Sequence, residues 1–203
     1  FAGEDWAPYA DLAGVALPVR ISTGEKKPAI AFDEDLLFTH RGLSGPAILQ
    51  ISSYWQPGQP LVINLLPHLD IAAALQEAKA SSKKQLPNLL AQWLPTRLAE
   101  AWCQHTPAWQ GPVNQCSDKA LAQLAHSLSH WQITPSGTEG YAKAEVTLGG
   151  VDTQALAQQS MQAKQQPGLF FIGEVVDITG WLGGYNFQWA WASAYACAQA
   201  LQA

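Results

Sequence analysis

The chain has 203 residues, of which 48% are hydrophobic and only 13% are charged, and its formal net charge is −5 at pH 7. This hydrophobic content is enough for a sizeable core and excludes a disordered chain, and the length allows one large domain or two modest ones. An acidic chain lacks the basic surface that nucleic acid or an anionic membrane requires, so we expect neither kind of partner.

The N-terminal residues and the cysteines bear on how the chain begins and in which compartment it is found. The chain begins without a methionine, its single methionine is Met161, and residues 1–6 lack the features of a signal peptide. We therefore expect an internal start with sequence missing upstream; a processed mature N-terminus is the alternative. Cys103, Cys116 and Cys197 are odd in number and widely spaced, which predicts a reducing, cytoplasmic setting and no disulfide.

Residues 1–66 have the pattern of a small β-structure. Apolar residues alternate along residues 15–21, which predicts a strand with one buried face, and Pro18 favours a position at the sheet edge. Further short apolar runs, each bounded by turn residues, lie at Ala29–Phe32, Leu36–Thr39 and Leu61–Leu65. We expect a small antiparallel sheet or barrel.

Between residues 67 and 131 the apolar period changes to that of helices. Asp70 and Ser117 are placed to cap two of them, so this stretch predicts a helical subdomain inserted into the sheet. Gln132–Thr134 and Ala144–Leu148 then look like strands, which assigns residues 132–150 to the same β-rich domain as residues 1–66.

Residues 151–203 form the third predicted part. The apolar run Leu169–Ile172 predicts a buried central strand, and a glycine-rich loop leads from it to a helix over about Tyr185–Leu201. No charged residue follows Asp177, but polar residues interrupt the helix, so we expect it to be buried in protein rather than in a membrane.

A strand, an acidic turn, paired glycines and a helix N-terminus are what a nucleotide cofactor uses. The helix start offers free N–H groups and partial positive charge, the glycines allow close approach, and Glu174 or Asp177 can hold a sugar or ribityl hydroxyl. The alternative is that Gly183 and Gly184 only make a tight connection.

Three runs carry a more specific resemblance. They are Gly168–Asp177 continued by Gly180–Trp191, the run Leu37–Ala47, and the run Ala144–Val151. Taken in their order along the chain, these runs resemble the YhiN/BaiN-type family of FAD-dependent oxidoreductases, across nearly the whole chain. The resemblance covers the family's inserted domain and its C-terminal FAD segment, whereas the G-x-G-x-x-G loop of the N-terminal Rossmann-like half is absent here.

The resemblance implies an α+β, multi-part fold: an antiparallel sheet or barrel with a helical insert, and a C-terminal strand-loop-helix from an FAD/NAD(P)-binding domain. It predicts a fragment of an FAD-dependent oxidoreductase with NAD(P)H-linked hydride transfer and an unknown substrate. The predicted cofactor-binding residues are Gly173, Glu174, Asp177, Gly183, Gly184, Tyr185, Asn186 and Phe187.

Without the diphosphate loop, we expect this chain alone to bind FAD weakly or not at all and to be inactive. Its expected partners are the missing Rossmann-like half and a second copy through the C-terminal helix. A binding or interaction module without catalysis or cofactor is the alternative function.

His40 is the candidate catalytic residue, because histidine can donate or accept a proton near neutral pH. The alternative is that Thr39 and His40 end a strand and satisfy backbone groups. His126 and His130 have the i, i+4 spacing of a metal pair but no third ligand nearby, so we expect a solvated surface and no metal.

Overall fold

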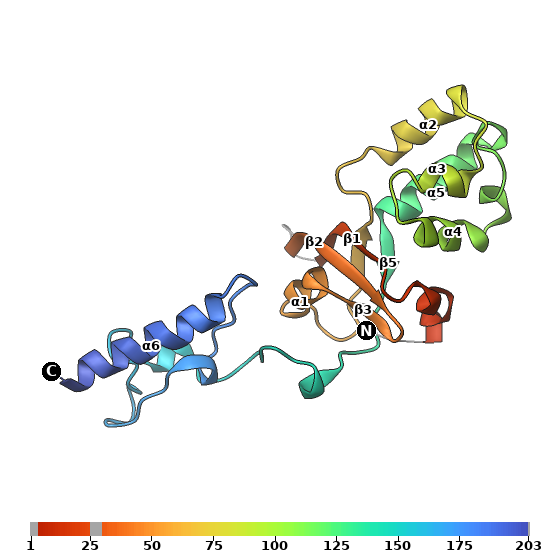
Figure 1. Ribbon diagram of the computed structural model, residues 1–203. Helices are drawn as coiled ribbons and strands as arrows, with labels where there is room; N and C mark the ends of the chain where they lie inside the picture. The colour runs from red at the N-terminus through yellow and green to blue at the C-terminus, as the bar shows by residue number, and fades with distance from the viewer. Residues whose placement is uncertain (1–3, 25–29, 203) are drawn as a thin grey trace. The chain divides into compact units, whose positions relative to one another are not determined.

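The computed structural model describes residues 4–24 and 30–202. The chain divides into two compact units, Phe1–Thr138 and Glu139–Ala203. The first unit holds an antiparallel sheet and a group of helices, and the second holds looped segments and one long helix (Figure 1). The α+β fold class predicted from the sequence is confirmed.

The sheet of the first unit has the strand order β3-β2-β1-β4-β5, and all neighbouring strands are antiparallel. Its strands are β1 (Ala16–Thr23), β2 (Ile30–Thr39), β3 (Gly42–Ser44), β4 (Leu61–Asn64) and β5 (Trp131–Ile133). Two apolar runs that were predicted as separate strands are joined in β2. Ala29, where the first of these runs begins, lies outside the described residues.

Pro18 does not place β1 at the edge of the sheet. β1 lies between β2 and β4, but β4 pairs only with Arg20–Thr23, whereas β2 pairs with the whole of β1. In the half of β1 that contains Pro18, the described residues supply a paired strand on one side only. A missing N–H on the other side costs no ladder hydrogen bond there.

The hairpin between β2 and β3 is closed by Thr39. Its hydroxyl accepts hydrogen bonds from the backbone N–H groups of Arg41 (3.2 Å) and Gly42 (3.1 Å) and donates to the carbonyl of Gly42 (2.8 Å). Gly45 follows with φ +87°, and a Cβ there would lie 2.8 Å from the carbonyl oxygen of Asp35. Only glycine fits this approach, which lets helix α1 (Pro46–Ser52) begin against the sheet.

Helices fill the stretch between β4 and β5. They are α2 (Ile71–Ser81), α3 (Leu86–Leu90), α4 (Thr96–Gln104) and α5 (Asp118–Ser129), with the short 3₁₀ turns η2 (Pro107–Trp109) and η3 (Val113–Gln115) before α5. Asp70 caps α2 by accepting from Ala73 N (3.0 Å), and Ser117 caps α5 by accepting from Ala120 N (3.2 Å). Both caps predicted from the sequence are confirmed.

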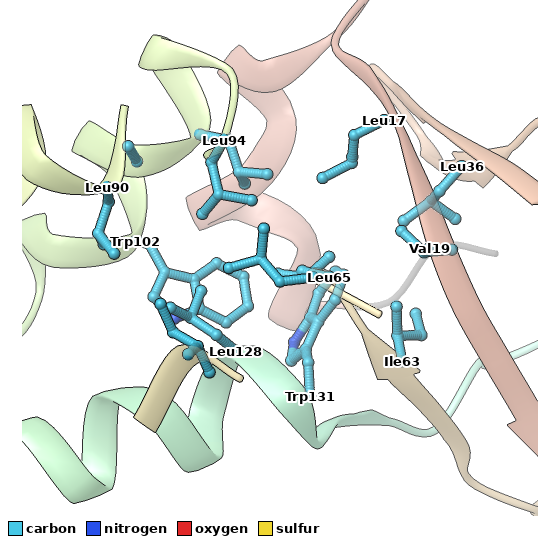
Figure 2. Packing of buried hydrophobic residues seen from close by; sticks show 14 of the residues in the cluster. Leu17, Val19, Leu36, Ile63, Leu65, Leu90, Leu94, Trp102, Leu128 and Trp131 are labelled. Atoms are coloured by element: carbon cyan, nitrogen blue, oxygen red, sulfur yellow. The ribbon is translucent and has the colours of Figure 1, made fainter. Parts of the chain in front are cut away.

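One hydrophobic core joins this sheet to these helices, and Trp131 lies at its centre (Figure 2). The Trp131 ring stacks on Phe38 of β2 (centroids 5.9 Å apart) and meets Trp102 of α4 edge-on (5.3 Å). Tyr9, from the 3₁₀ helix η1 (Glu4–Leu12), packs on it as well (5.2 Å). Arg97 of α4 donates to the backbone carbonyls of Asp11 in η1 and of Ala13 just after it. These hydrogen bonds attach the N-terminal segment to α4.

The second unit contains the 3₁₀ turns η4 (Gly140–Ala142), η5 (Thr153–Ala155) and η6 (Gly173–Val175), and the helix α6 (Tyr185–Gln202). Its own small core consists of Leu156, Met161, Val176 and Cys197. In place of strands, this unit has isolated β-bridges between single residues. The bridge between Val151 and Val176 is parallel. No helix among the described residues is long and apolar enough to cross a bilayer.

Two predicted strands of this unit do not form. Leu169–Ile172 makes a single bridge, from Phe170 to Gln162, and the side chains of Leu169 and Ile172 are 42% and 43% exposed. Ala144–Leu148 is irregular and mostly exposed. Apolar runs of this kind become strands only when a neighbouring strand pairs with their backbone. Among the described residues of this unit, no strand lies beside either run, and the Phe170–Gln162 bridge is the one β-type pairing that the two runs make.

Removing the ring at the centre of the core should weaken the first unit strongly. We expect Trp131→Ala to lower the free energy of unfolding by about 3–5 kcal/mol, because the indole is 8% exposed and its cavity cannot collapse among three other rings. Urea unfolding followed by far-UV circular dichroism measures the change. Trp191→Ala is the matched control, since Trp191 of α6 is 76% exposed. Equal effects of the two substitutions would contradict the role of Trp131 in the core.

Candidate functional site

The predicted cofactor-binding residues all lie in the second unit, where η6 is fastened to α6. The N–H of Gly173 donates to the hydroxyl of Ser193 (2.9 Å), and the carbonyl of Gly173 accepts from the indole N–H of Trp189 (3.0 Å). Ser193 is fully buried and donates in turn to the helix backbone at Trp189 (2.8 Å). Gly173 adopts φ +69°, which suits glycine, so the turn that carries Glu174 has a fixed place along α6.

The loop that leads into α6 is closed by one amide side chain. Asn186 accepts from the N–H of Gly180 through Oδ1 (2.7 Å) and donates from Nδ2 to the carbonyl of Gly180 (3.1 Å). A Cβ at Gly180 would lie 2.8 Å from the Cβ of Tyr185, so glycine is required for this closure. Asn186 therefore shapes the loop, and its polar atoms are engaged within the protein.

The start of α6 is open to solvent. Gly183 and Gly184 have φ +118° and +87°, and a Cβ at Gly184 would meet nothing within 4 Å. Tyr185 and Phe187 are 63% and 78% exposed. The first N–H groups of a helix have no acceptor within it and carry partial positive charge, so this end presents donors beside two exposed aromatic rings.

The two predicted carboxylates differ in what they contact. Asp177 accepts from the N–H of Gly149 through Oδ1 (3.2 Å), and its own N–H donates to the carbonyl of Val151 (2.9 Å). Asp177 thus holds the double-glycine turn in place. Glu174 is exposed on η6, and its side chain is the carboxylate that a ligand can reach from solvent.

These features test whether a flavin nucleotide fits. The open space over the start of α6 admits a ring system with an electron-rich edge, the helix N–H groups favour negative charge on that edge, and the exposed rings offer a stacking surface. Glu174 supplies an acceptor for hydroxyl groups. The residues present fit such a group, and the set of cofactor-binding residues remains a prediction.

His40 lies in the first unit, exposed at the tip of the β2–β3 hairpin. Its neighbour Thr39 satisfies the backbone groups of the turn, and the carbonyl of Thr39 accepts from the indole N–H of Trp6 (3.1 Å). In the alternative interpretation, Thr39 and His40 satisfy backbone groups at the end of a strand, and Thr39 does so. The catalytic role of His40 remains a prediction.

The histidine pair of α5 makes a local contact. The rings of His126 and His130 stack with centroids 4.9 Å apart, and Nδ1 of His130 is 2.9 Å from the hydroxyl of Ser129. Across residues 4–24 and 30–202 no group of three or more His, Cys, Asp or Glu side chains is placed to hold a metal ion.

Cys103 should be chemically inert despite lining a hollow of about 310 Å³ beside Glu100 and Gln110. Burial raises the pKa of its thiol to about 12, so at pH 8 about one molecule in ten thousand carries the thiolate that reacts. We expect native Cys103 to be alkylated by iodoacetamide at least about a hundredfold more slowly than Cys103 of the urea-unfolded chain, with the rate still rising above pH 10. Peptide mass spectrometry measures this, and equal rates in both states would contradict it.

Asn186 should control the order of the α6 entry loop. Asn186→Ala removes both bonds to Gly180, each worth about 1 kcal/mol. We expect faster amide hydrogen exchange over residues 178–186, measured by mass spectrometry, while the exchange of Val151 and Asp177 stays unchanged. Gln188→Ala, an exposed substitution on the same turn of α6, is the control; an equal effect of both would refute the role of Asn186.

The chain is similar to several curated bacterial proteins. The chain is 54% identical to ribosomal RNA dihydrouridine synthase of Escherichia coli over 191 residues, which are 94% of this chain and 47% of that protein. It is 50% identical over 188 residues to the protein of the same name from Haemophilus influenzae, covering 92% and 46%. It is 25% identical over 206 residues to 3-dehydro-bile acid delta(4,6)-reductase of Clostridium scindens, covering 95% and 50%. The chain thus spans about half the length of these relatives.

Two predictions are contradicted by the relatives with 50–54% identity. The predicted function, a fragment of an NAD(P)H-linked FAD-dependent oxidoreductase, is wrong, because these relatives are named for the modification of ribosomal RNA. The predicted absence of a nucleic-acid partner is wrong for the same reason. The net charge averages the chain: residues 67–131 hold five Lys or Arg against four Asp or Glu, and the rest hold six against twelve.

The resemblance seen in the motifs has support at the level of the family. The relative from Clostridium scindens is a reductase, in keeping with the flavoprotein family that the motifs resemble. The family model described as "HI0933-like protein barrel and H2TH domain" matches residues 2–146. This match covers the sheet and the helices between β4 and β5, which together make up more than half of the chain. The chain therefore belongs to the family of the HI0933-like protein barrel and H2TH domain.

Proposed function

We propose that this chain is part of an enzyme that reduces uridine in ribosomal RNA to dihydrouridine. The observation that carries the proposal is the 54% and 50% identity to two ribosomal RNA dihydrouridine synthases over more than nine-tenths of the chain. Identity to the bile-acid reductase is about half as high over a similar length. The substrate class is therefore taken from the two former relatives.

The reaction saturates one double bond. Dihydrouridine differs from uridine by two hydrogens at C5 and C6 of the uracil ring, so the enzyme must deliver a hydride and a proton. A bound reduced flavin supplies a hydride for chemistry of this kind. We assign its site to residues 151–203, as part of an FAD-binding domain, because the open start of α6 fits the flavin's ring edge.

Within this site the residues have separate duties. The first N–H groups of α6, exposed by Gly183 and Gly184, would stabilise negative charge on the flavin ring. Glu174 would accept hydrogen bonds from ribityl or ribose hydroxyls, and Asp177 would hold the turn at Gly149 that faces it. Asn186 would keep the loop before α6 closed.

His40 is our candidate for the proton donor. It is exposed at the tip of a hairpin whose turn is closed by the hydroxyl of Thr39, and histidine is the side chain that enzymes use most often for proton transfer.

A chimera tests the proposed function. The 191 matched residues of the Escherichia coli synthase are replaced by this chain and expressed in a strain that lacks its own enzyme. We expect dihydrouridine to return to ribosomal RNA, as measured by nucleoside mass spectrometry of the purified RNA. A chimera that accumulates as folded protein but leaves the RNA without dihydrouridine would overturn the proposal.

Two matched glycine substitutions in the chimera test the flavin site. Gly184→Val fills the open space over the start of α6, whereas Gly168→Val is introduced at a similar φ (+84° against +87°), again with nothing within 4 Å. Backbone strain is thus similar in both. For Gly184→Val alone, we expect bound flavin to fall at least tenfold, as measured by its visible absorbance. Dihydrouridine formation should fall to the same extent in this variant.

A further inference from the structure

The end of α2 and the start of α5 lie side by side (Figure 1), and four lysines lie in these two segments and in the loop after α2. Lys79 lies in the last turn of α2, Lys83 and Lys84 follow in the α2–α3 loop, and Lys119 lies in the first turn of α5. The last three are exposed. We call Lys83, Lys84 and Lys119 the lysine surface.

An ion pair links α2 to α5 at this place. Lys79 Nζ donates to Asp118 Oδ1 at 2.6 Å, and this bond together with the lysine's charge lowers the pKa of Asp118. Asp118 therefore remains ionised and neutralises Lys79. Lys119, the next residue along α5, is exposed, and Asp118 is engaged by Lys79 instead.

The α2–α3 loop is held in one conformation. The hydroxyl of Ser82 accepts from the N–H of Lys84 (3.1 Å), and the carbonyl of Lys84 accepts from the N–H of Val113 (2.9 Å). Two residues further, Leu86 N donates to the carbonyl of Gly111 (3.1 Å). The backbone that carries Lys83 and Lys84 is thereby clamped to the segment just before α5, so little backbone entropy is lost when these lysines bind a ligand.

The charge of this surface contrasts with the rest of the chain. Four lysines face two carboxylates, Glu77 and Asp118, at this end of the helices, whereas the residues outside 67–131 carry twice as many acidic as basic side chains. Exposed ammonium groups without an ion-pair partner bind anions, and an array of them fits a polymer of phosphates.

We propose that the lysine surface binds the phosphate backbone of the RNA on which the enzyme acts. The proposal rests on the proposed function for its choice of RNA over other polyanions. Lysine contacts to phosphate position an RNA without reading its sequence. The surface would therefore hold the RNA on the enzyme without selecting its sequence.

Salt dependence makes the proposal measurable. Each phosphate neutralised by a lysine contributes about 0.7 to 0.9 to the slope of log Kd against log salt concentration. We expect the substitution of Lys83 and Lys84 by Gln to weaken binding of the 203-residue chain to deproteinised ribosomal RNA by about tenfold or more. The slope should fall by about 1.5, and Lys119→Gln alone should lower it by about half as much.

The control removes the same charge elsewhere. Lys143→Gln with Lys164→Gln changes two exposed lysines of the second unit, and we expect Kd and slope to stay within twofold of the parent chain. Filter binding at several salt concentrations measures all variants, and thermal unfolding checks that each is folded. Unchanged binding by the Lys83/Lys84 variant, or no RNA binding by the parent chain, would overturn the proposal, as would a loss of binding to phosphatidylglycerol vesicles without a loss for RNA.

The same substitutions in the chimera separate this proposal from the proposed function. Dihydrouridine formed at the parent rate by a Lys83/Lys84 variant would reject the lysine surface and leave the enzyme assignment intact. A parent chimera that makes no dihydrouridine, while the chain still binds RNA through these lysines, would reject the enzyme assignment and keep the surface.

Discussion

The contact of Trp131 with Phe38 and Trp102 is the constraint on which the first unit depends. A five-stranded sheet with a three-residue edge strand and a set of short helices would each bury little surface alone. Because the indole of β5 fills the space between β2 and α4, the two parts share one core and the helices are oriented on the sheet. The hydrogen bond from Leu65 N to Leu128 O (2.9 Å) ties the chain entering the helices to the chain leaving them.

The parts of the fold that could be predicted from sequence are those with local causes. The alternating residues of β1, the cap at Asp70 and the cap at Ser117 act through their neighbours in sequence, and the structure has all three. Leu169–Ile172 failed because whether an apolar run becomes a strand depends on other strands. Pro18 misled for a related reason, since β1 has two neighbours for only half its length.

For the candidate site, the sequence predicted a set of cofactor-binding residues, but not which of them shape the loop and which are open to solvent. Glycine spacing indicated the start of α6, but the pairing of Asn186 with Gly180 and of Gly173 with Ser193 required the folded loop. The lysine surface was missed entirely, because a net charge says nothing about how charges are distributed. Counting the charges of residues 67–131 separately shows only that this segment, with five basic and four acidic residues, lacks the acidic excess of the rest.

The edge-on pair of Trp102 and Trp131 has an optical consequence. Two indoles 5.3 Å apart at an interplanar angle of 85° couple their strong far-ultraviolet transitions and give a pair of dichroic bands of opposite sign that neither ring has alone. One ring belongs to the helices and the other to the sheet, so these bands register only the union of the two parts. They would vanish if the helices separated from the sheet while remaining helical. Circular dichroism therefore detects the contact between the two parts without any label.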